Sequence, residues 1–289
     1  MTISTLLVYT ITGLTYGMLF FLIAVGLSII LGVMDIVNLA HGSFFMFGSY
    51  LAFSMMNQNL GFWSALLLSV LIVAAFGFLV EKFLLKKIHG NHLNQVLLTF
   101  GITFMFVDVI RLFWGTQTHM LNFPKILDFS INIGGSEFPS YRLFVVIVGL
   151  IIALILWYFE SHTRIGAILR AGVDDKEMVS ALGINVGLVF TGVFAFGAGL
   201  AAFGGVLGGP ILGIYPTIGF EILVTSLTVL VVGGLGSWKG AFFAAILIGQ
   251  IETWGQVLFE SFSMILIFLL MLGVLTFKPT GLFSRRGSL

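Results

Sequence analysis

Long apolar runs dominate this chain from its first residues. Across the first 80 positions Asp35 is the only charged residue, and the first Lys or Arg is Lys82. Hydrophobic residues make up 59% of the sequence and charged residues 9%, whereas soluble domains carry roughly 25% charged residues. The runs reach the length of about 20 residues that a helix needs to cross a bilayer. They are continuous rather than alternating, which excludes a membrane β-barrel. The sequence predicts an all-α, polytopic integral membrane helical bundle.

Nine apolar segments are expected to span the membrane. They lie near 5–33, 38–57, 61–83, 94–114, 141–160, 186–208, 219–235, 241–258 and 262–277. The stretch 34–42 between the first two is too short for an ordinary loop, so a tight turn or a broken helix is expected there. A different reading of these two segments gives eight or ten spans instead. Residues 1–289 are expected to form a single transmembrane domain.

The basic residues set the expected orientation, because loops rich in Lys and Arg stay in the cytoplasm. Placing loop 84–93 inside puts ten basic residues inside and two outside. The inner set is Lys82, Lys86, Lys87, Arg164, Arg170, Lys176, Lys239, Lys278, Arg285 and Arg286, and the outer pair is Lys125 and Arg142. The C-terminus is therefore expected in the cytoplasm. The sequence has no basic stripe that would suit nucleic acid, so lipid is the expected surrounding.

A polar segment at 165–185 interrupts the apolar pattern. A helix with a charged side and an apolar side is expected near 172–183, between two spans on the inner side. Its polar residues are Arg170, Asp174, Asp175, Lys176 and Glu177, and Met178, Ala181 and Leu182 supply the apolar side before Gly183. Such a helix suits docking of a soluble partner, and the alternative is an ordinary solvated loop.

Small residues recur every four positions at Ala201, Gly205, Gly209 and Gly213. Stripes of this kind let helix backbones approach closely in lipid. Tight helix packing or a dimer face is expected here, with a pore-lining role as the alternative. Gly208-Gly-Pro210 is expected to end this span.

Four polar residues are candidates for a translocation path or a broken helix, because ionisable groups are costly inside a bilayer. Asp35, Asn38 and His41 lie close together, and Asn38 and His41 are expected to share a helix face. Supporting freed backbone groups and contacting substrate directly are the two roles considered for them. Glu252 falls in the middle of a span and is expected to be the most buried carboxylate, where it either fixes helix packing or carries protons.

The remaining motifs argue against an enzyme. The five histidines are scattered, and there is no HExxH, no GxSxG and no cysteine. The glycine-rich stretch 233–240 lacks the order of a phosphate-binding loop and is expected to be a tight inner turn. The outer loop 115–140 is either a connector or a docking surface, and Gly134-Gly135 predicts a small hairpin within it. No cofactor or metal is expected in this chain. A secondary transporter or channel remains an alternative, since Asp35 and Glu252 could serve a coupling ion.

Several motifs taken together resemble the permease subunits of bacterial ABC importers for branched-chain amino acids, including the similar urea-type permeases. The resemblance runs from about Gly13 to Phe283. The matching motifs are Asn38-Leu-Ala-His-Gly42, Gly26-Leu27, Gly32-Val33, Arg170-Ala171, Asp175, Glu177-Met178, Gly183-Ile-Asn185, Gly233-Gly-Leu-Gly-Ser237, Gly240-Ala241, Gly249, Glu252 and Pro279-Thr-Gly-Leu-Phe283. Val179 and Lys239 depart from the pattern, where Ala and Pro are usual.

The resemblance implies a type II ABC importer-like machine in a bacterial inner membrane. A second permease, usually a paralogue, would complete the translocation path. Two cytoplasmic ATPase subunits, which hold ATP and Mg, would dock on the helix near 172–183. An extracytoplasmic binding protein would deliver the substrate, for which branched-chain amino acids are the first expectation and urea or short amides the second.

Overall fold

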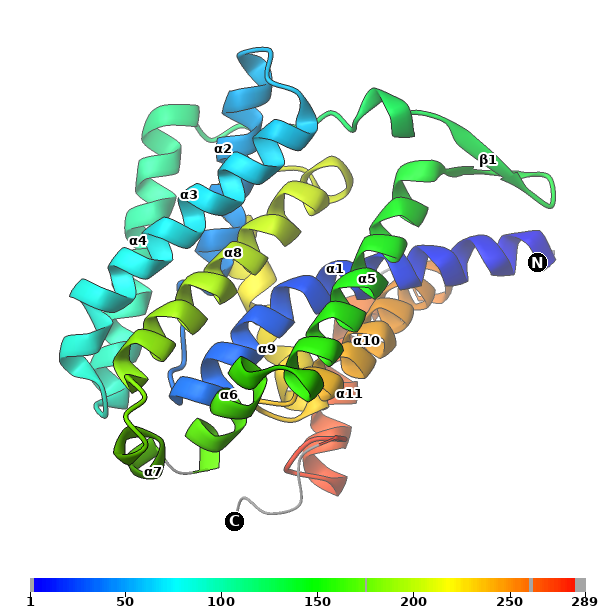
Figure 1. The fold of residues 1–289 in the computed structure, drawn as a ribbon. Helices are drawn as coiled ribbons and strands as arrows, with labels where there is room; N and C mark the ends of the chain where they lie inside the picture. The colour runs from blue at the N-terminus through cyan, green and yellow to red at the C-terminus, as the bar shows by residue number, and fades with distance from the viewer. Residues whose placement is uncertain (1–2, 175, 260–261, 284–289) are drawn as a thin grey trace.

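The computed structural model describes residues 3–174, 176–259 and 262–283. These residues form a helical bundle with one small hairpin at an end (Figure 1). The elements are α1 (Ile3–Met34), α2 (His41–Asn57), α3 (Phe62–Phe83), η1 (Leu85–Ile88), α4 (His92–Trp114), η2 (Lys125–Leu127), β1 (Ser130–Ile133), β2 (Ser136–Pro139), α5 (Ser140–His162), α6 (Arg164–Asp174), α7 (Lys176–Ala181), α8 (Val186–Leu212), α9 (Ile218–Gly233), α10 (Trp238–Leu258) and α11 (Ser263–Phe277).

Each of the nine apolar segments contains a helix, which confirms an all-α polytopic membrane protein. Within the described residues six helices are long and apolar enough to cross a bilayer: α1, α3 with η1, α4, α5, α8 and α10. The apolar helices α9 and α11 are shorter, and α2 has 17 residues. One boundary was wrong, because α8 continues through Pro210 to Leu212 instead of ending at the Gly-Gly-Pro sequence.

The helices α1 and α8 form the centre of the bundle. The helix α1 packs along α10 and α8, while α2 and α3 pack along the other sides of α8. In its most apolar stretch α1 is 83% buried, whereas α5 is 17% buried. A largely exposed apolar helix at the rim suits contact with lipid or with another membrane subunit, so the inner and outer helices of the bundle face different surroundings.

Glycine allows the closest helix crossings. A Cβ at Gly17 of α1 would lie 2.9 Å from Cα of Ile246 on α10, and a Cβ at Gly249 would collide with backbone atoms of Gly17. The contact between α2 and α9 is as close, because a Cβ at Gly42 would meet the carbonyl oxygen of Gly219. These crossings leave no room for a side chain, as expected for small residues between membrane helices.

The outer loop contains the predicted hairpin. The strands β1 and β2 pair antiparallel, and Gly134 and Gly135 form the turn with φ of 59° and 92°. Two positive φ values are what a two-residue hairpin turn requires, and glycine adopts them without strain. Before the hairpin, His119 and Ile214 exchange two backbone hydrogen bonds of 2.8 Å, which tie the loop to the α8–α9 connection.

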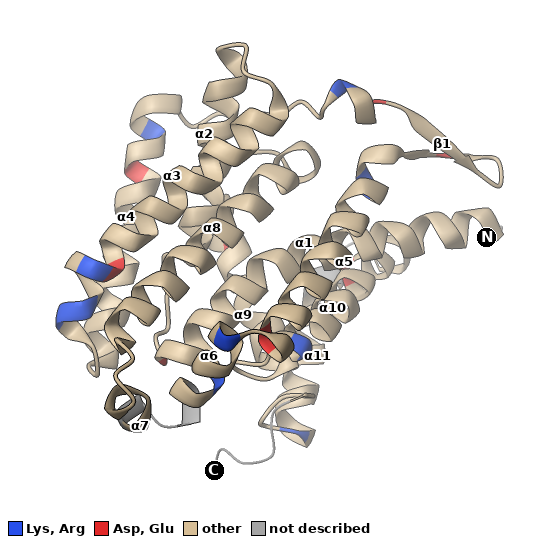
Figure 2. Cartoon of the chain, viewed as in Figure 1, with Lys and Arg blue, Asp and Glu red and all other residues tan. Residues whose placement is uncertain are grey.

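The basic residues concentrate at the opposite end of the bundle. Figure 2 shows most Lys and Arg positions around the ends of α3, α6 and α10 and few near the hairpin. The glycine-rich stretch 233–240 turns tightly at this end, with Gly234 and Gly236 at positive φ. After α11 the chain returns to it, since the amide of Leu282 donates to the carbonyl of Val232 over 2.9 Å.

Candidate functional site

Two short helices, α6 and α7, project from the basic end of the bundle (Figure 1). The single helix expected near 172–183 is therefore divided: α6 ends at Asp174 and α7 covers Lys176–Ala181. Gly183, with φ of 81°, closes α7, and its amide donates to the carbonyl of Ser180. A glycine at positive φ is a common helix terminator. Asp175 lies outside the described residues, as do the side chains of Asp174, Lys176 and Glu177.

The inner face of this pair packs on the bundle, and its outer face does not. Val179 of α7 is buried, and it lines a small apolar cavity with Val33 of α1 and Phe190 of α8. On the outer side Met178 is 61% exposed and Leu182 is 74% exposed, beside exposed Ala181. These exposed side chains follow a segment that is rich in charged residues in the sequence.

A polar clip fastens α6 to two spans. The guanidinium of Arg170 donates to the backbone carbonyl of Glu160 at the end of α5. The carboxylate of the same Glu160 accepts a hydrogen bond from the indole N–H of Trp238, the first residue of α10. Sequence reasoning placed Arg170 on the docking surface, whereas the structure shows it half-buried and bonded within the chain. A movement of α6 would therefore reach α5 and α10 directly.

The break between α1 and α2 lies at the second group of candidates. Asp35 leaves α1 with φ of 57° and forms an exposed ion pair with His92 over 3.6 Å. His41 then begins α2 with its Nε2 2.9 Å from the carbonyl oxygen of Ile23. Ile23 lies 11 residues before Met34, or about 16 Å along the helix at 1.5 Å per residue. The non-helical segment 36–40, which ends in a turn at Leu39 and Ala40, thus leads back into the bundle before α2 starts.

Side chains of α4 support this non-helical segment. Thr99 accepts from the amide of Leu39 over 3.2 Å, and Thr103 donates to the carbonyl of Leu39 over 3.1 Å. The side chain of Asn38 accepts from the amide of Ala40 over 3.1 Å. Non-helical backbone at membrane depth requires such partners. Asn38 therefore does not share a helix face with His41, because it precedes the helix and bends back on the chain.

Buried polar atoms without a partner gather at the same break. Within the described residues Nδ2 of Asn38, Nδ1 of His41 and the hydroxyl of Ser43 are buried and make no hydrogen bond. Native structures contain few such atoms, and they often mark functional positions. The break keeps unused hydrogen-bonding capacity inside an otherwise apolar bundle.

Two expectations about acidic residues were wrong. Glu252 is only partly buried on α10 and is separate from the break, where Asp35 is exposed at the surface rather than at membrane depth. Among the described side chains the fully buried carboxylate is Glu81 in the last turn of α3, with 0% exposure. It accepts a hydrogen bond from Thr191 of α8 and lies 3.4 Å from Nε2 of His89. Sequence reasoning missed Glu81 because the adjacent Lys82 made it look like a surface residue.

The stripe of small residues from Ala201 to Gly213 packs against other parts of the same chain. Ala201 is buried, Gly205 faces the backbone of Phe45 on α2, and Gly209 faces Leu121 of the outer loop. Gly213 lies beyond the helix as its C-terminal cap with φ of 75°. The stripe thus contacts α2 and the outer loop, both of this chain.

At the outer end Tyr215 donates a hydrogen bond to the carboxylate of Glu221. Burial raises the pKa of Tyr215, and the bond to Glu221 raises it further. The phenol thus stays protonated and holds the α8–α9 connection to the first turn of α9.

The chain belongs to the family described as the branched-chain amino acid transport system permease component, which its residues 9–275 match. It is 30% identical to the high-affinity branched-chain amino acid transport system permease protein BraD of Pseudomonas aeruginosa, over 95% of this chain and 94% of that protein. Two permease proteins of the same kind from Salmonella typhimurium also match: LivH is 29% identical over 94% of this chain and 94% of its own length, and LivM 25% over 93% and 68%.

One solved structure has a similar fold. It is PsaBC from Streptococcus pneumoniae in complex with Fab, with a TM-score of 0.51 and 13% identity, covering 92% of this chain and 89% of that one. At this identity the likeness concerns the fold alone.

Proposed function

We propose that this chain is one of two permease subunits of an ABC importer for branched-chain amino acids. The names of its relatives support the substrate class. LivH and LivM, two permease proteins of one organism, both match this chain, which supports a paralogous second permease as its partner. The other partners are two cytoplasmic ATPase subunits, which bind ATP and Mg, and an extracytoplasmic binding protein.

The α6–α7 projection carries this proposal. It presents Met178 and Leu182 to water at the basic end of the bundle, and the clip through Glu160 attaches its base to α5 and α10. A surface exposed on one side and rigidly attached on the other suits a lever that an ATPase moves. Closure of the ATPases would shift α6 and α7, and the attached spans would follow.

The distribution of charge supports an orientation for the complex. The basic end is the cytoplasmic end under the positive-inside rule, in a bacterial inner membrane. The C-terminal segment returns to this end through Leu282 and Phe283, so the C-terminus belongs on the cytoplasmic side.

The break at 35–41 is the proposed point of contact with cargo. An amino acid that crosses the bundle must exchange its hydration for polar partners. A buried polar group without a hydrogen bond costs about 1–3 kcal/mol in protein mutants, and more on transfer to a fully apolar medium. The unused groups of Asn38 and His41 supply such partners beside a helix start. Here the chain binds and positions the solute, and the partner ATPases supply the energy.

Reconstituted uptake tests the proposal. The chain purified alone and the chain with its co-purifying partners are placed in separate proteoliposomes, and entry of labelled leucine is followed. We expect entry only when a binding protein is outside and ATP and Mg are inside with the ATPases. Uptake by the lone chain along an ion gradient would identify a secondary transporter, and passive entry would identify a channel. Either result overturns the proposal.

A further inference from the structure

Glu81 is a buried carboxylate to which the proposed transport cycle assigns no role. It lies in the last turn of α3, two residues before Phe83 and shortly before the short helix η1. Its Oε2 accepts from the hydroxyl of Thr191, and its Oε1 makes no hydrogen bond within the described residues. The nearest ion-pair partner of Oε1 is Nε2 of His89, 3.4 Å away. A buried carboxylate at this position needs a compensating proton or charge.

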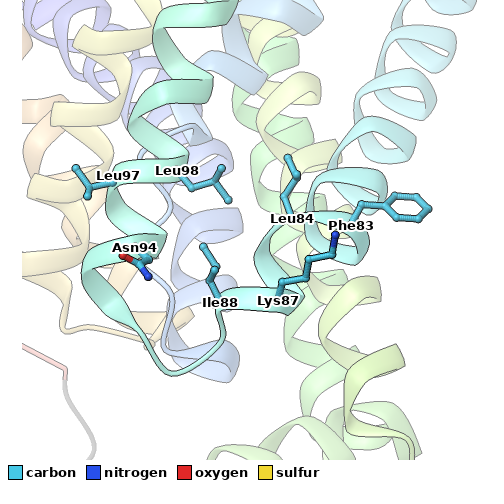
Figure 3. Close-up of a pocket in the computed structure, with 7 residues that line it drawn as sticks. All are labelled: Phe83, Leu84, Lys87, Ile88, Asn94, Leu97 and Leu98. Carbon is cyan, nitrogen blue, oxygen red and sulfur yellow. The ribbon is translucent and has the colours of Figure 1, made fainter.

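Three lysines follow Glu81 in the sequence, and within the described residues none of them forms an ion pair with it. On α3 the amine of Lys82 lies over the rings of Phe78 and Phe83. On η1 Lys87 lines the groove between α3 and α4 (Figure 3), and the amine of Lys86 lies beside Gly187. The neighbouring α8 contains no ionisable residue.

The helix α2, which also packs on α3, contributes two titratable side chains. They are His41, bonded to the carbonyl of Ile23, and Tyr50. Among the described residues His89 is therefore the group that can neutralise Glu81. Its side chain is 29% exposed, which lets it exchange protons with the cytoplasm.

The contact joins the end of α3 to the start of α8. Thr191 lies in the second turn of α8, which follows α7 directly in the chain. The ring of His89 lies edge-on to Phe190, 5.6 Å between centroids, on the same turn. Glu81, His89 and Thr191 thus fasten the start of α8 to the end of α3, at the base of the α6–α7 projection.

We propose that Glu81, His89 and Thr191 form a proton-dependent latch that holds the inner ends of α3 and α8 together. In the closed state Glu81 and His89 share one proton, either as a carboxylate with an imidazolium or as a carboxylic acid with a neutral imidazole. When α8 moves away, water solvates the carboxylate and the proton leaves to the cytoplasm. Closing binds a proton, so a rise in internal pH favours the open state.

Thiol labelling of the assembled complex tests the latch. This part of the inference concerns the contact alone, whereas its effect on transport rests on the proposed function. The chain has no cysteine, so Val80→Cys introduces its single thiol next to Glu81, at a position 4% exposed. Labelling by a maleimide is measured from about pH 5 to about pH 8. Each rate is divided by the rate in the Glu81→Gln background, which removes the pH dependence of the thiol itself.

We expect this ratio to rise about fivefold with pH, because the carboxylate opens the latch as histidine loses its proton. Glu81→Gln should stay closed at every pH, since the amide accepts from Thr191 without a charge. His89→Gln should label faster at neutral pH, because Glu81 then lacks its partner. If the contact were merely structural, both Glu81→Gln and His89→Gln would label faster than the unsubstituted contact. Slower labelling in Glu81→Gln together with faster labelling in His89→Gln therefore identifies the latch. His92→Gln is the matched control in the same loop, where His92 pairs with exposed Asp35.

A flat ratio, or the same acceleration in His92→Gln as in His89→Gln, would overturn the latch. Uptake is measured on the same complexes at varied internal pH, and the wild-type profile should flatten in Glu81→Gln. ATP-driven uptake with a flat labelling ratio refutes the latch and leaves the importer standing. A rising ratio without ATP-driven uptake supports the latch and refutes the importer.

Discussion

Two interruptions of helical structure in this chain have opposite surroundings. The break after the exposed Asp35 is largely buried: Thr99 and Thr103 support its backbone from α4, and Ile36 and Asn38 are fully enclosed. The projection at α6 and α7 is fastened at its base, and Met178 and Leu182 on its other side are 61% and 74% exposed. A buried interruption must find its partners within the chain, because lipid offers none. An exposed one can leave its partners to another subunit.

The two interruptions differ in what a substitution should disturb. At the break side chains of the same chain bond the backbone of Leu39 and Ala40, so substitutions of these supporting residues should first disturb the fold. At the projection the chain provides the attachment but not the contact, so substitutions on its outer face should disturb coupling and spare the fold. The four predictions below test this division.

The largest effect is expected on the outer face of α7. Ala181→Glu puts a charge beside Leu182 in the middle of the proposed ATPase contact, where an unpaired buried charge is strongly unfavourable. We expect ATP-driven uptake to fall at least about tenfold, since 1.4 kcal/mol already corresponds to a factor of ten. The melting temperature of the chain should not change. Uptake in proteoliposomes and thermal unfolding in detergent measure the two effects.

Gln117→Glu is the control for Ala181→Glu. Gln117 is exposed in the outer loop, at the end of the bundle away from α7, so the same charge there should leave uptake unchanged. Normal coupled uptake in Ala181→Glu would show that α7 is not the docking surface.

Gly42→Ala tests the buried side of the comparison. The new Cβ would collide with the carbonyl oxygen of Gly219, where α2 meets α9. Neither the new Cβ nor the carbonyl oxygen can rotate away as the end of a side chain could, so the two helices must separate. Overpacking of this kind costs about 1–3 kcal/mol. We expect a lower melting temperature together with lost uptake.

The matched control is Gly101→Ala in the middle of α4, where a Cβ would meet no atom within 4 Å. It should leave both the melting temperature and uptake unchanged. A stable and active Gly42→Ala variant would mean that α2 and α9 are not held in this close crossing.

The spans and the hairpin could be predicted from the sequence, and the rotation of each helix could not. Hydropathy identifies segments that suit a bilayer, and Gly134-Gly135 specifies a turn by its backbone requirements alone. Burial of a carboxylate depends on which neighbour its helix face meets. Glu252 lies in the middle of an apolar run and looks buried, yet Glu81 next to Lys82 is the one enclosed by α8. Only tertiary packing distinguishes the two.

How deeply the break lies in the bundle could not be predicted from the sequence either. The pattern of Asp35, Asn38 and His41 indicated an interruption, but the spacing of three residues suggested one helix face for the last two. That spacing applies only inside a helix, and α2 starts at His41. The supporting residues Thr99 and Thr103 lie some 60 residues away in the sequence, and a polar pair in an apolar span gives no indication of which backbone it serves.

A smaller effect is expected at the clip that attaches the projection. Trp238→Phe keeps the aromatic ring and removes the N–H that donates to Glu160. Because a hydrogen bond to a charged group contributes about 1.5–3 kcal/mol, we expect looser attachment of α6, with ATP hydrolysis retained and less solute moved for each ATP, by about threefold or more. Trp157→Phe, which alters an exposed tryptophan on α5, is the control. An unchanged ratio of transport to hydrolysis in Trp238→Phe would exclude the clip as part of the lever.

The smallest effect is expected at the support of the break. Thr103→Val removes a hydroxyl that bonds to Thr99 in its own helix and to Leu39 in the non-helical segment. Thr276→Val on α11 removes only a bond within its own helix, to Leu272. The difference between the two variants therefore isolates the contact with Leu39, for which we expect a loss of about 1 kcal/mol. It should appear as a lower melting temperature in Thr103→Val with the transport-to-ATP ratio unchanged. Equal melting temperatures in the two variants would mean that α4 does not support the break, and a changed ratio would mean that the buried interruption takes part in coupling as the exposed one does.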